Sequence, residues 1–317
     1  MRNTLALLLL CSCPAFAADA DFNGRWDIRY PGGSDRASWL EVQGAGTASP
    51  KVKFVSASNG DLNATDEVTI GGGELVFGFR NKVRRQPGED PVETHYVFKA
   101  RLSGAQLMGT FETERSGLAP ASWVGVRAPE IKDKDDGTWR ESKPVQLFNG
   151  KDLAGWAPLE KNRQFGWMAE NGVLKASGSG ANLVSTAKFW NFKLHIEYKT
   201  AQGGNSGIGL RGRYEIQVLD DLGKPPDAHS NGSLYSRIAP RVNASKAPGE
   251  WQSYDITLIG RDLTVVLNGQ KLIDKQVVEG LTAMGHDPNE GEPGPLSLQG
   301  DHGPVEFRNI VLTPLVK

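Results

Sequence analysis

Hydrophobic and polar positions alternate along most of this chain with a period close to two residues. Between residues 208 and 218 the even positions are largely apolar, whereas positions 211, 213, 215 and 217 hold Arg, Arg, Glu and Gln. Such alternation is typical of strands with one buried face, because successive side chains of a strand point to opposite sides. No segment keeps the helical i, i+3, i+4, i+7 spacing beyond about two turns. The pattern therefore predicts an all-β protein.

The first set of predicted strands is short and separated by Gly, Asn and Pro. We expect it to build a small antiparallel β-barrel-like domain at residues 20–127. Its strands are expected at residues 22–28, 51–55, 74–77, 94–100 and 106–111. The opening Gly-Arg-Trp and the closing Leu-Met-Gly-Thr-Phe resemble the two ends of lipocalin- or avidin-like up-and-down barrels.

A second and larger set of predicted strands follows, from residue 172 to residue 312. Asn171-Gly172 and Asn268-Gly269 each separate two apolar runs. They fit the tight type I′ hairpin turn, whose two central residues both need positive φ. About nine antiparallel strands over this length are too many for one flat sheet. We therefore predict a two-sheet jelly-roll sandwich at residues 145–317.

The sequence turns polar between the two sets of strands, at residues 128–144. Prolines stand at positions 129 and 144, and the charged run Lys-Asp-Lys-Asp-Asp-Gly lies at residues 132–137. This composition predicts a linker. We interpret the charged run as a solvated segment, because the spacing of an EF-hand calcium loop is not met.

The first residues have the features of a signal peptide covering residues 1–17. Arg2 precedes an apolar run at residues 5–10, and an Ala-Phe-Ala cleavage site follows at residues 15–17. We expect export to a bacterial periplasm or secretion. Cys13 also fits a lipoprotein box, so a lipid anchor there is the alternative. No later segment approaches 18 consecutive apolar residues, and no membrane span is expected.

Composition removes several classes of protein. Both cysteines lie in the predicted signal peptide, so the mature chain would have no disulfide and no thiol nucleophile. With 38 Gly and 18 Pro among 317 residues, a long helical bundle is excluded, and 8 Trp with 38% hydrophobic residues exclude a disordered chain. The net charge of −1 comes without a basic stripe, so no nucleic-acid partner is expected.

Polar residues of kinds that bind sugars or move protons gather in the second half of the chain. Glu215 and Gln217 occupy the polar face of a predicted strand, and Gln299, Asp301 and His302 lie in a closing Gln-Gly-Asp-His-Gly run. The glycines beside His302 would let the backbone approach a ligand closely.

Residues 145–317 resemble the 3-keto-disaccharide hydrolase family. The resemblance is carried, in order, by the segments 147–156 (LFNGKDLAGW), 205–208 (NSGI), Arg211 with 214–220 (YEIQVLD), 232–235 (GSLY), 248–251 (PGEW), 267–269 (LNG) and 298–310 (LQGDHGPVEFRNI). It implies a concanavalin-A-like jelly roll and cleavage of glycosides already oxidised to a ketone at C3. The first predicted domain is outside the resemblance.

A ketone at C3 acidifies the hydrogen on C2, so a base can remove it, the enolate can expel the group at C1, and water can add back. For catalysis the candidates are Glu215 and His302 as bases and Lys246 as a cation for the enolate oxygen. For substrate binding they are Asn205, Arg211, Gln217, Asp220, Tyr235, Asn243, Gln299 and Asp301. No cofactor is assigned from the sequence. A divalent metal stays open. Glu215, Asp220, Asp301 and His302 could bind one, although their spacing fits no metal motif.

Two other functions stay open at this point. In an ordinary retaining glycosidase, Glu215 and Asp220 would be the carboxylate pair, but on a regular strand they are about 16 Å apart on opposite faces, against ~5–5.5 Å in such enzymes. Only a bulge could bring them together. In a lectin, Trp156, Trp190 or Trp251 would be a stacking platform, and the jelly-roll fold alone does not distinguish lectin from enzyme. The natural glycoside and the oligomeric state are not predicted.

Overall fold

The computed structural model describes residues 19–31, 37–55, 61–65, 67–83, 90–114, 120–282 and 284–317. The predicted signal peptide, with Cys11 and Cys13, lies outside these residues. Apart from one 3-10 turn, η1 (Asp19–Phe22), all regular elements in the described ranges are strands, which confirms the all-β prediction. None of the described helical segments is long and apolar enough to cross a membrane.

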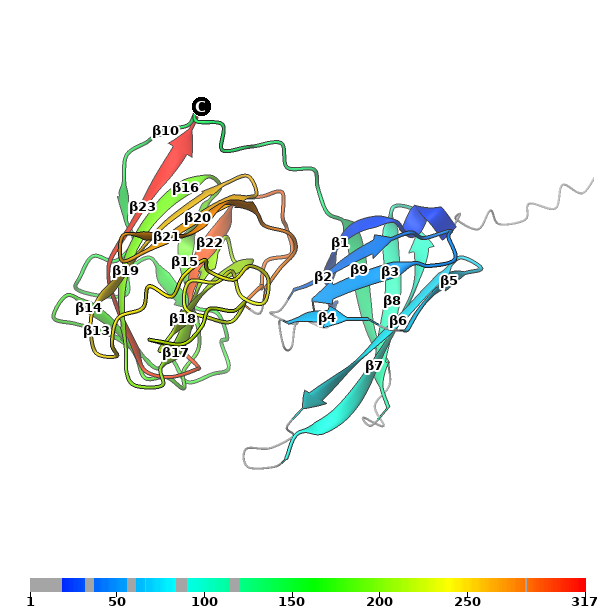
Figure 1. The fold of residues 1–317 in the computed structure, drawn as a ribbon, viewed down its shortest axis with the longest axis horizontal. Helices are drawn as coiled ribbons and strands as arrows, with labels where there is room; N and C mark the ends of the chain where they lie inside the picture. The colour runs from blue at the N-terminus through cyan, green and yellow to red at the C-terminus, as the bar shows by residue number, and fades with distance from the viewer. Residues whose placement is uncertain are drawn as a thin grey trace, which may run out of the picture.

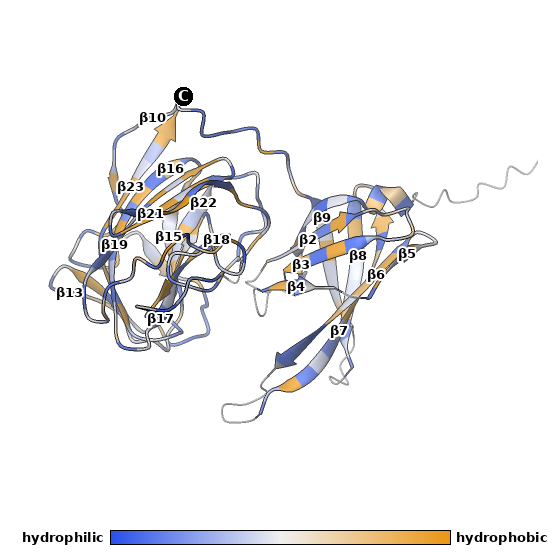
Figure 2. Cartoon of the chain, viewed as in Figure 1, coloured by the Kyte–Doolittle hydropathy of each residue, from blue (hydrophilic) through white to orange (hydrophobic). Residues whose placement is uncertain are grey.

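The first nine strands form one antiparallel sheet in the order β4-β3-β2-β1-β9-β8-β7-β6-β5. Figure 1 shows this sheet curling on itself (blue to cyan), and Figure 2 shows hydrophobic and hydrophilic residues alternating along β3 and β7. Phe54, Phe77 and Phe98 pack against one another inside the curl, with ring centroids 4.6–5.2 Å apart. The strands are β1 (Gly24–Arg29), β2 (Ser38–Gln43), β3 (Lys51–Val55), β4 (Leu62–Ala64), β5 (Glu67–Gly71), β6 (Glu74–Val83), β7 (Val92–Ser103), β8 (Gln106–Thr113) and β9 (Ala121–Arg127).

The remaining strands form two sheets that share one hydrophobic core. One sheet has the order β13-β14-β23-β16-β19-β20-β21, with the short β10 and β11 added to β23, and the other has the order β12-β15-β22-β17-β18. Leu194 and Tyr254 from the first of these sheets pack with Ile208 and Leu298 from the second. This arrangement confirms the predicted jelly-roll sandwich. The division into domains at 20–127 and 145–317 stays a prediction.

The strands of the larger sheet are β10 (Arg140–Glu141), β11 (Val145–Gln146), β13 (Trp167–Glu170), β14 (Val173–Ala176), β16 (Phe192–Thr200), β19 (Gln252–Ile259), β20 (Asp262–Leu267), β21 (Gln270–Val277) and β23 (Val305–Val316). Those of the five-stranded sheet are β12 (Trp156–Pro158), β15 (Leu183–Phe189), β17 (Asn205–Leu210), β18 (Tyr214–Leu219) and β22 (Gly294–Leu298). Both predicted Asn-Gly turns have positive φ at their two central residues, 52° and 78° at Asn171 and Gly172 and 51° and 81° at Asn268 and Gly269. They join β13 to β14 and β20 to β21, as expected for type I′ hairpins.

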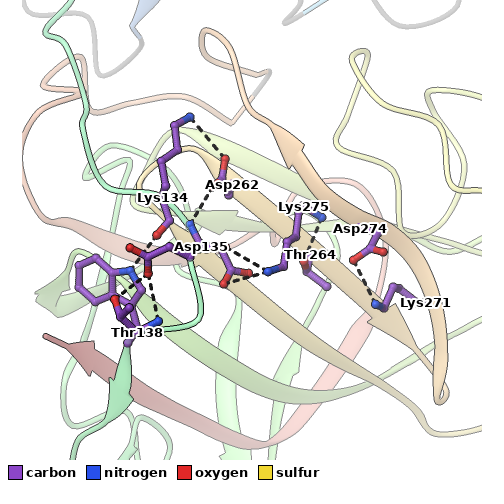
Figure 3. Close-up of polar contacts among 10 residues, drawn as sticks. Lys134, Asp135, Thr138, Asp262, Thr264, Lys271, Asp274 and Lys275 are labelled. Atoms are coloured by element: carbon purple, nitrogen blue, oxygen red, sulfur yellow. Dashed lines mark hydrogen bonds and ion pairs between the residues drawn. The ribbon is translucent and has the colours of Figure 1, made fainter.

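The charged run at 132–137 is solvated at Lys132, Lys134 and Asp136, as the sequence predicted, whereas Asp133 and Asp135 are tied to the sandwich. The Asp133 carboxylate accepts hydrogen bonds from Trp190 Nε1 and Asn191 Nδ2, each at 2.8 Å. The Asp135 amide donates to the Asp262 carboxylate at 2.8 Å, and Lys275 lies 3.2 Å from the Asp135 carboxylate (Figure 3). The carboxylates of the run find donors at the ends of the larger sheet, which the local composition could not reveal.

The first sheet also contacts the sandwich directly. Trp39 of β2 packs with Ala37, Val55 and Leu281 in a small apolar cluster. The Ala37 amide donates to the carbonyl of Gly285 at 3.0 Å. Leu281 and Gly285 belong to the segment 278–293 between β21 and β22, so the first sheet packs on the segment that borders the site described next.

Candidate functional site

The outer face of the five-stranded sheet carries Glu215 and Gln217 of β18. In the pairing of β17 with β18, Glu215 is opposite Gly209 and Gln217 is opposite Gly207. Since Ile216 is in the core, the alternation turns Glu215 and Gln217 to the other face of the sheet. The side chains therefore lie over a floor of glycines.

That floor has to be glycine for Glu215 to sit where it does. A Cβ at Gly207 would be 2.4 Å from Glu215 Oε1 and 2.9 Å from the sulfur of Met284. Glu215 is 2% exposed, and its amide donates to Thr282 Oγ1 at 2.8 Å. The carboxylate thus lies between the sheet and the residues that follow β21, among them Thr282 and Met284.

Tyr235 lies beside Glu215 because the segment 227–238 runs along the outer edge of β18. The Tyr235 amide donates to the Glu215 carbonyl at 3.0 Å. Burial raises the pKa of the Tyr235 phenol to about 12, and the negative charges of Asp61 and Glu215 act in the same direction. At neutral pH Tyr235 is therefore a protonated hydroxyl, able to donate a hydrogen bond to a developing negative charge.

Two amide side chains flank Gly207. Gln299 is 8% exposed, and its backbone amide donates to the Gly207 carbonyl at 2.9 Å. Gln217 is 4% exposed and its Oε1 has no hydrogen-bond partner among the described residues. An amide offers both donors and acceptors, which suits the hydroxyls of a sugar.

Asp301 and His302 lie at the other end of β17. β22 runs beside β17, with Ser297 opposite Gly209. After β22 the chain continues to the first residue of β17, where a Cβ at Gly303 would be 3.5 Å from the Asn205 backbone. Glu215 is opposite Gly209, whereas the loop that holds His302 passes Asn205, four residues or ~13 Å further along β17. Glu215 and His302, which were expected to meet in one cleft, are at opposite ends of the strand.

The two residues at this far end are bound to each other. His302 Nδ1 is 2.6 Å from Asp301 Oδ1, and Arg163 Nη1 is 2.5 Å from Asp301 Oδ2. Burial raises the pKa of Asp301, but the hydrogen bonds from His302 and Arg163 outweigh it and lower the pKa to about 2. The Asp301 carboxylate therefore stays charged and fixes the ring of the half-exposed His302.

Arg211, expected to bind substrate, is instead fully buried in the turn between β17 and β18. Its guanidinium donates to the carbonyls of Trp190 and Gly260, at 2.6 and 2.7 Å, and to Asn191 Oδ1 at 3.1 Å. It also stacks on the Trp190 ring at 4.0 Å. Its contacts tie the turn to the opposite sheet, so we leave it out of the proposed site.

Three further candidates bind loop backbone. Lys246 Nζ donates to the Trp251 carbonyl at 3.1 Å, and Asn243 Nδ2 donates to the Asp221 carbonyl at 2.7 Å. The Asp220 carboxylate accepts from the Gly203 amide at 2.8 Å. The structure therefore brings together Glu215, Gln217, Tyr235 and Gln299. It places Asn205, Asp301 and His302 together at the far end of β17. The remaining candidates, Lys246, Arg211, Asp220 and Asn243, hold turns and loops.

The alternatives left open by the sequence find little support in these contacts. The pairing of β17 with β18 runs without a register shift from Asn205 and Leu219 to Leu210 and Tyr214. No bulge of this hairpin brings Asp220 next to Glu215. Of the three candidate stacking platforms, Trp156 is 8% exposed, Trp190 lies under Arg211, and Trp251 lies under Lys199 and Arg308.

His229 is a residue of this region that the sequence analysis missed. Its ring meets the ring of Tyr235 edge to face, with centroids 4.9 Å apart. A His-Ser-Asn turn in a loop carries no strand pattern, so nothing local distinguished it. Among the described residues, no three His, Cys, Asp or Glu side chains are arranged to hold a metal ion.

Residues 143–313 match the model of a family described as the 3-keto-alpha-glucoside-1,2-lyase-like domain. A 3-keto-disaccharide hydrolase of Bacteroides thetaiotaomicron is 30% identical over 172 residues, which is 43% of this chain and 57% of that protein. The chain thus spans little more than half of that relative. A solved Parabacteroides distasonis protein, described as a candidate glycosyl hydrolase, is 29% identical with a TM-score of 0.46, covering 58% of this chain and 90% of its own. A second from that organism is 26% identical with a TM-score of 0.44, covering 55% and 94%.

Proposed function

The chain belongs to the 3-keto-alpha-glucoside-1,2-lyase-like family, and from this premise we propose that it cleaves glycosides whose sugar carries a ketone at C3. The observation that carries the proposal is the buried Glu215 carboxylate over Gly207, beside the protonated hydroxyl of Tyr235. Elimination next to a ketone needs this combination of a base and a donor for the enolate charge.

In the proposed reaction the Glu215 carboxylate takes the proton from C2. The electron pair of the C2–H bond forms the enolate, with its charge on the ketone oxygen at C3, where the Tyr235 hydroxyl donates a hydrogen bond. The enolate then reforms the ketone and expels the oxygen on C1, which leaves with its electron pair and takes up a proton. Water adds to C1 and a proton returns to C2, so the net reaction is hydrolysis.

The amides of Gln217 and Gln299 would hold hydroxyls of the ring being cleaved, since both flank Gly207 below Glu215. His302, in the loop beside Asn205 and about 13 Å further along the sheet, is too far to act on the same C2. We assign the Asp301–His302 pair to binding the part of the substrate beyond the broken bond.

The test compares a plain disaccharide with its 3-keto form, with released sugar as the readout. We expect release from the keto form only, and deuterium at C2 of the product when the reaction runs in D₂O. Glu215→Gln should lower kcat by about 10²–10⁴, because an amide cannot take the proton. Asp220→Asn is the matched control, since it changes a carboxylate of the same hairpin that binds only a turn.

Equal release from both substrates would indicate an ordinary glycosidase. Product without deuterium at C2 would exclude elimination, and an active Glu215→Gln variant would move the base elsewhere. Glu215 is buried, so Gln is chosen over Ala to avoid a cavity that would cost stability.

A further inference from the structure

We propose that the first sheet supplies part of the active site: Asp61, immediately before β4, positions His229 of the sandwich as the acid that protonates the leaving oxygen. The inference rests on the proposed elimination reaction, which needs a proton donor for the oxygen on C1. It also gives a role to the half of the chain that the family match leaves out.

Asp61 reaches across to the segment 227–238, which forms one edge of the site. Asp61 Oδ1 is 3.1 Å from His229 Nε2, and the neighbouring Leu62 amide donates to Ser236 Oγ at 3.1 Å. Two contacts from adjacent residues hold the beginning of β4 against this segment. The same segment donates the Tyr235 amide to the Glu215 carbonyl, so Asp61 is bound to the wall of the site.

His229 is held on several sides. Its amide donates to Asp227 Oδ1 at 2.7 Å, its carbonyl accepts from Gln217 Nε2 at 3.4 Å, and its ring contacts Tyr235. When the Asp61 carboxylate accepts the proton on Nε2, the other ring nitrogen, Nδ1, is the one left to exchange a proton with substrate. The side chain is 52% exposed, so Nδ1 can be reprotonated from water after each turnover.

Electrostatics place Asp61 in the same group. The negative charges of Asp61 and Glu215 both raise the pKa of the Tyr235 phenol, in addition to its burial. One of these carboxylates comes from the first sheet and the other from the sandwich. Asp61 is therefore close enough to the Tyr235 hydroxyl for its charge to act on it, together with the charge of Glu215 from the sandwich.

An apolar contact fixes the position from which Asp61 reaches over. Trp39, on the strand next to β3, packs with Leu281, and a Cβ at Gly280 would be 2.6 Å from the Trp39 ring. The residue after Leu281 is Thr282, which accepts the hydrogen bond of the Glu215 amide. Docking of the first sheet thus positions Asp61 and supports the segment that holds Glu215.

The proposed step balances as follows. Protonated His229 gives the proton on Nδ1 to the oxygen leaving C1 and becomes neutral. Nδ1 then takes a proton from the water that adds to C1, which regenerates the starting form. Asp61 keeps its charge throughout and acts only through His229, as a positioning residue.

The test uses the full chain with the variants Asp61→Asn, His229→Gln and both together, assayed on a 3-keto disaccharide. We expect Asp61→Asn to lower kcat about 10- to 100-fold with KM within about twofold, the range for carboxylates that orient a metal-bound histidine. His229→Gln should lower kcat at least as far. The double variant should be no slower than His229→Gln, because two residues acting as a unit are not additive. Asp61→Glu should recover part of the loss.

Asn289→Ala is the matched control. It removes the hydrogen bond from Arg29, another contact between the first sheet and the sandwich, without touching His229. A merely structural role of Asp61 predicts that Asp61→Asn and Asn289→Ala lower kcat alike, or that the losses of Asp61→Asn and His229→Gln multiply. Either result, or wild-type kcat in Asp61→Asn, overturns the proposal.

A second measurement separates this proposal from the proposed function. The ¹⁵N chemical shifts of the His229 ring report which nitrogen carries the proton, with or without activity. In the neutral form of the ring, we expect the proton on Nε2 in the wild type and a shift toward Nδ1 in Asp61→Asn. If the wild type turns over no 3-keto substrate, the proposed function fails. If the proton pattern of His229 is the same with and without Asp61, the positioning role fails.

Discussion

At the scale of single residues, the site depends on the absence of a side chain at Gly207. Its backbone does not need glycine for conformational reasons, since its φ lies outside the left-handed range, yet a side chain there would overlap the Glu215 carboxylate. Gly207 therefore acts by leaving room, and its substitution tests the position of Glu215 without altering the carboxylate itself.

Gly207→Ala should lower kcat on a 3-keto disaccharide by at least tenfold, because the new Cβ, 2.4 Å from Oε1, forces the carboxylate away from C2. The melting temperature should fall by a few degrees, as expected when the ends of two flexible side chains, Glu215 and Met284, have to move. Gly71→Ala is the control, since its Cβ meets nothing within 4 Å and its φ is ordinary. Unchanged kcat in Gly207→Ala would show that Glu215 does not act from this position.

At the scale of elements, the β17–β18 hairpin separates two kinds of polar residue that look alike in the sequence. Glu215 and Gln217 follow the alternation of β18 and leave the core. Arg211 is in the turn with a φ of 53°, and its side chain crosses to the opposite sheet. Arg213 is also buried and donates to the carbonyls of Asp287 and Glu292. The arginines therefore anchor the hairpin that carries Glu215.

Arg211→Met should lower the free energy of unfolding by about 3 kcal/mol, because two carbonyls and the Asn191 side chain lose their buried donor. Urea unfolding measures the change, and Arg241→Met at an exposed position is the control. The KM of the folded variant should stay within about twofold of the wild type. An unchanged unfolding curve with a much higher KM would instead support the substrate-binding role expected from the sequence.

At the scale of the whole molecule, the first sheet and the sandwich meet around buried charges. Asp27 of β1 is 1% exposed, and its Oδ1 has no hydrogen-bond partner among the described residues. Burial, and then the charge of Glu290 from the sandwich, raise the pKa of Asp27 to about 8. Glu290 is itself fully buried, forms an ion pair with Arg261 at 2.8 Å, and burial raises its pKa as well. The contact between the two parts therefore holds a proton at neutral pH.

The pH dependence follows from the direction of this shift. Unfolded Asp27 would lose its proton near pH 3.8, whereas the folded protein keeps it up to about pH 8. Between these values the folded state binds more protons, so the free energy of unfolding falls as the pH rises, by at most ~1.4 kcal/mol per pH unit from this group. Asp27→Asn should flatten that slope between pH 4 and 8 relative to the wild type.

Urea unfolding at several pH values measures this slope, and Asp90→Asn at an exposed position just before β7 is the control. Wild-type pH dependence in Asp27→Asn would contradict a proton held between Asp27 and Glu290. The comparison with the wild type is essential, because titrating groups away from Asp27 and Glu290 contribute equally to both proteins.

Much of the fold could be predicted from the sequence, because it depends on short-range patterns. The period of two identified the all-β class, and the two Asn-Gly pairs located hairpins, since a type I′ turn needs only its own two residues to adopt positive φ. The predicted strands of the first domain correspond to β1, β3, β6, β7 and β8, whereas β2, β4, β5 and β9 were missed. In β2, Ser38-Trp39-Leu40 is buried throughout, because Trp39 packs against the sandwich, and this contact hides the alternation.

The candidate site, too, could be predicted from the sequence only in part. By itself the sequence determined the class of fold, the hairpins, and the strand that turns Glu215 and Gln217 out of the core, since side-chain direction in a strand follows from the period of the backbone. Only the tertiary structure decided that Arg211 anchors a turn, that His302 lies at the far end of the sheet, and that Asp61 reaches His229, which is 168 residues away in the sequence. The physical reason is that burial and charge pairing depend on which segments meet in space. No local sequence pattern indicates which segments meet.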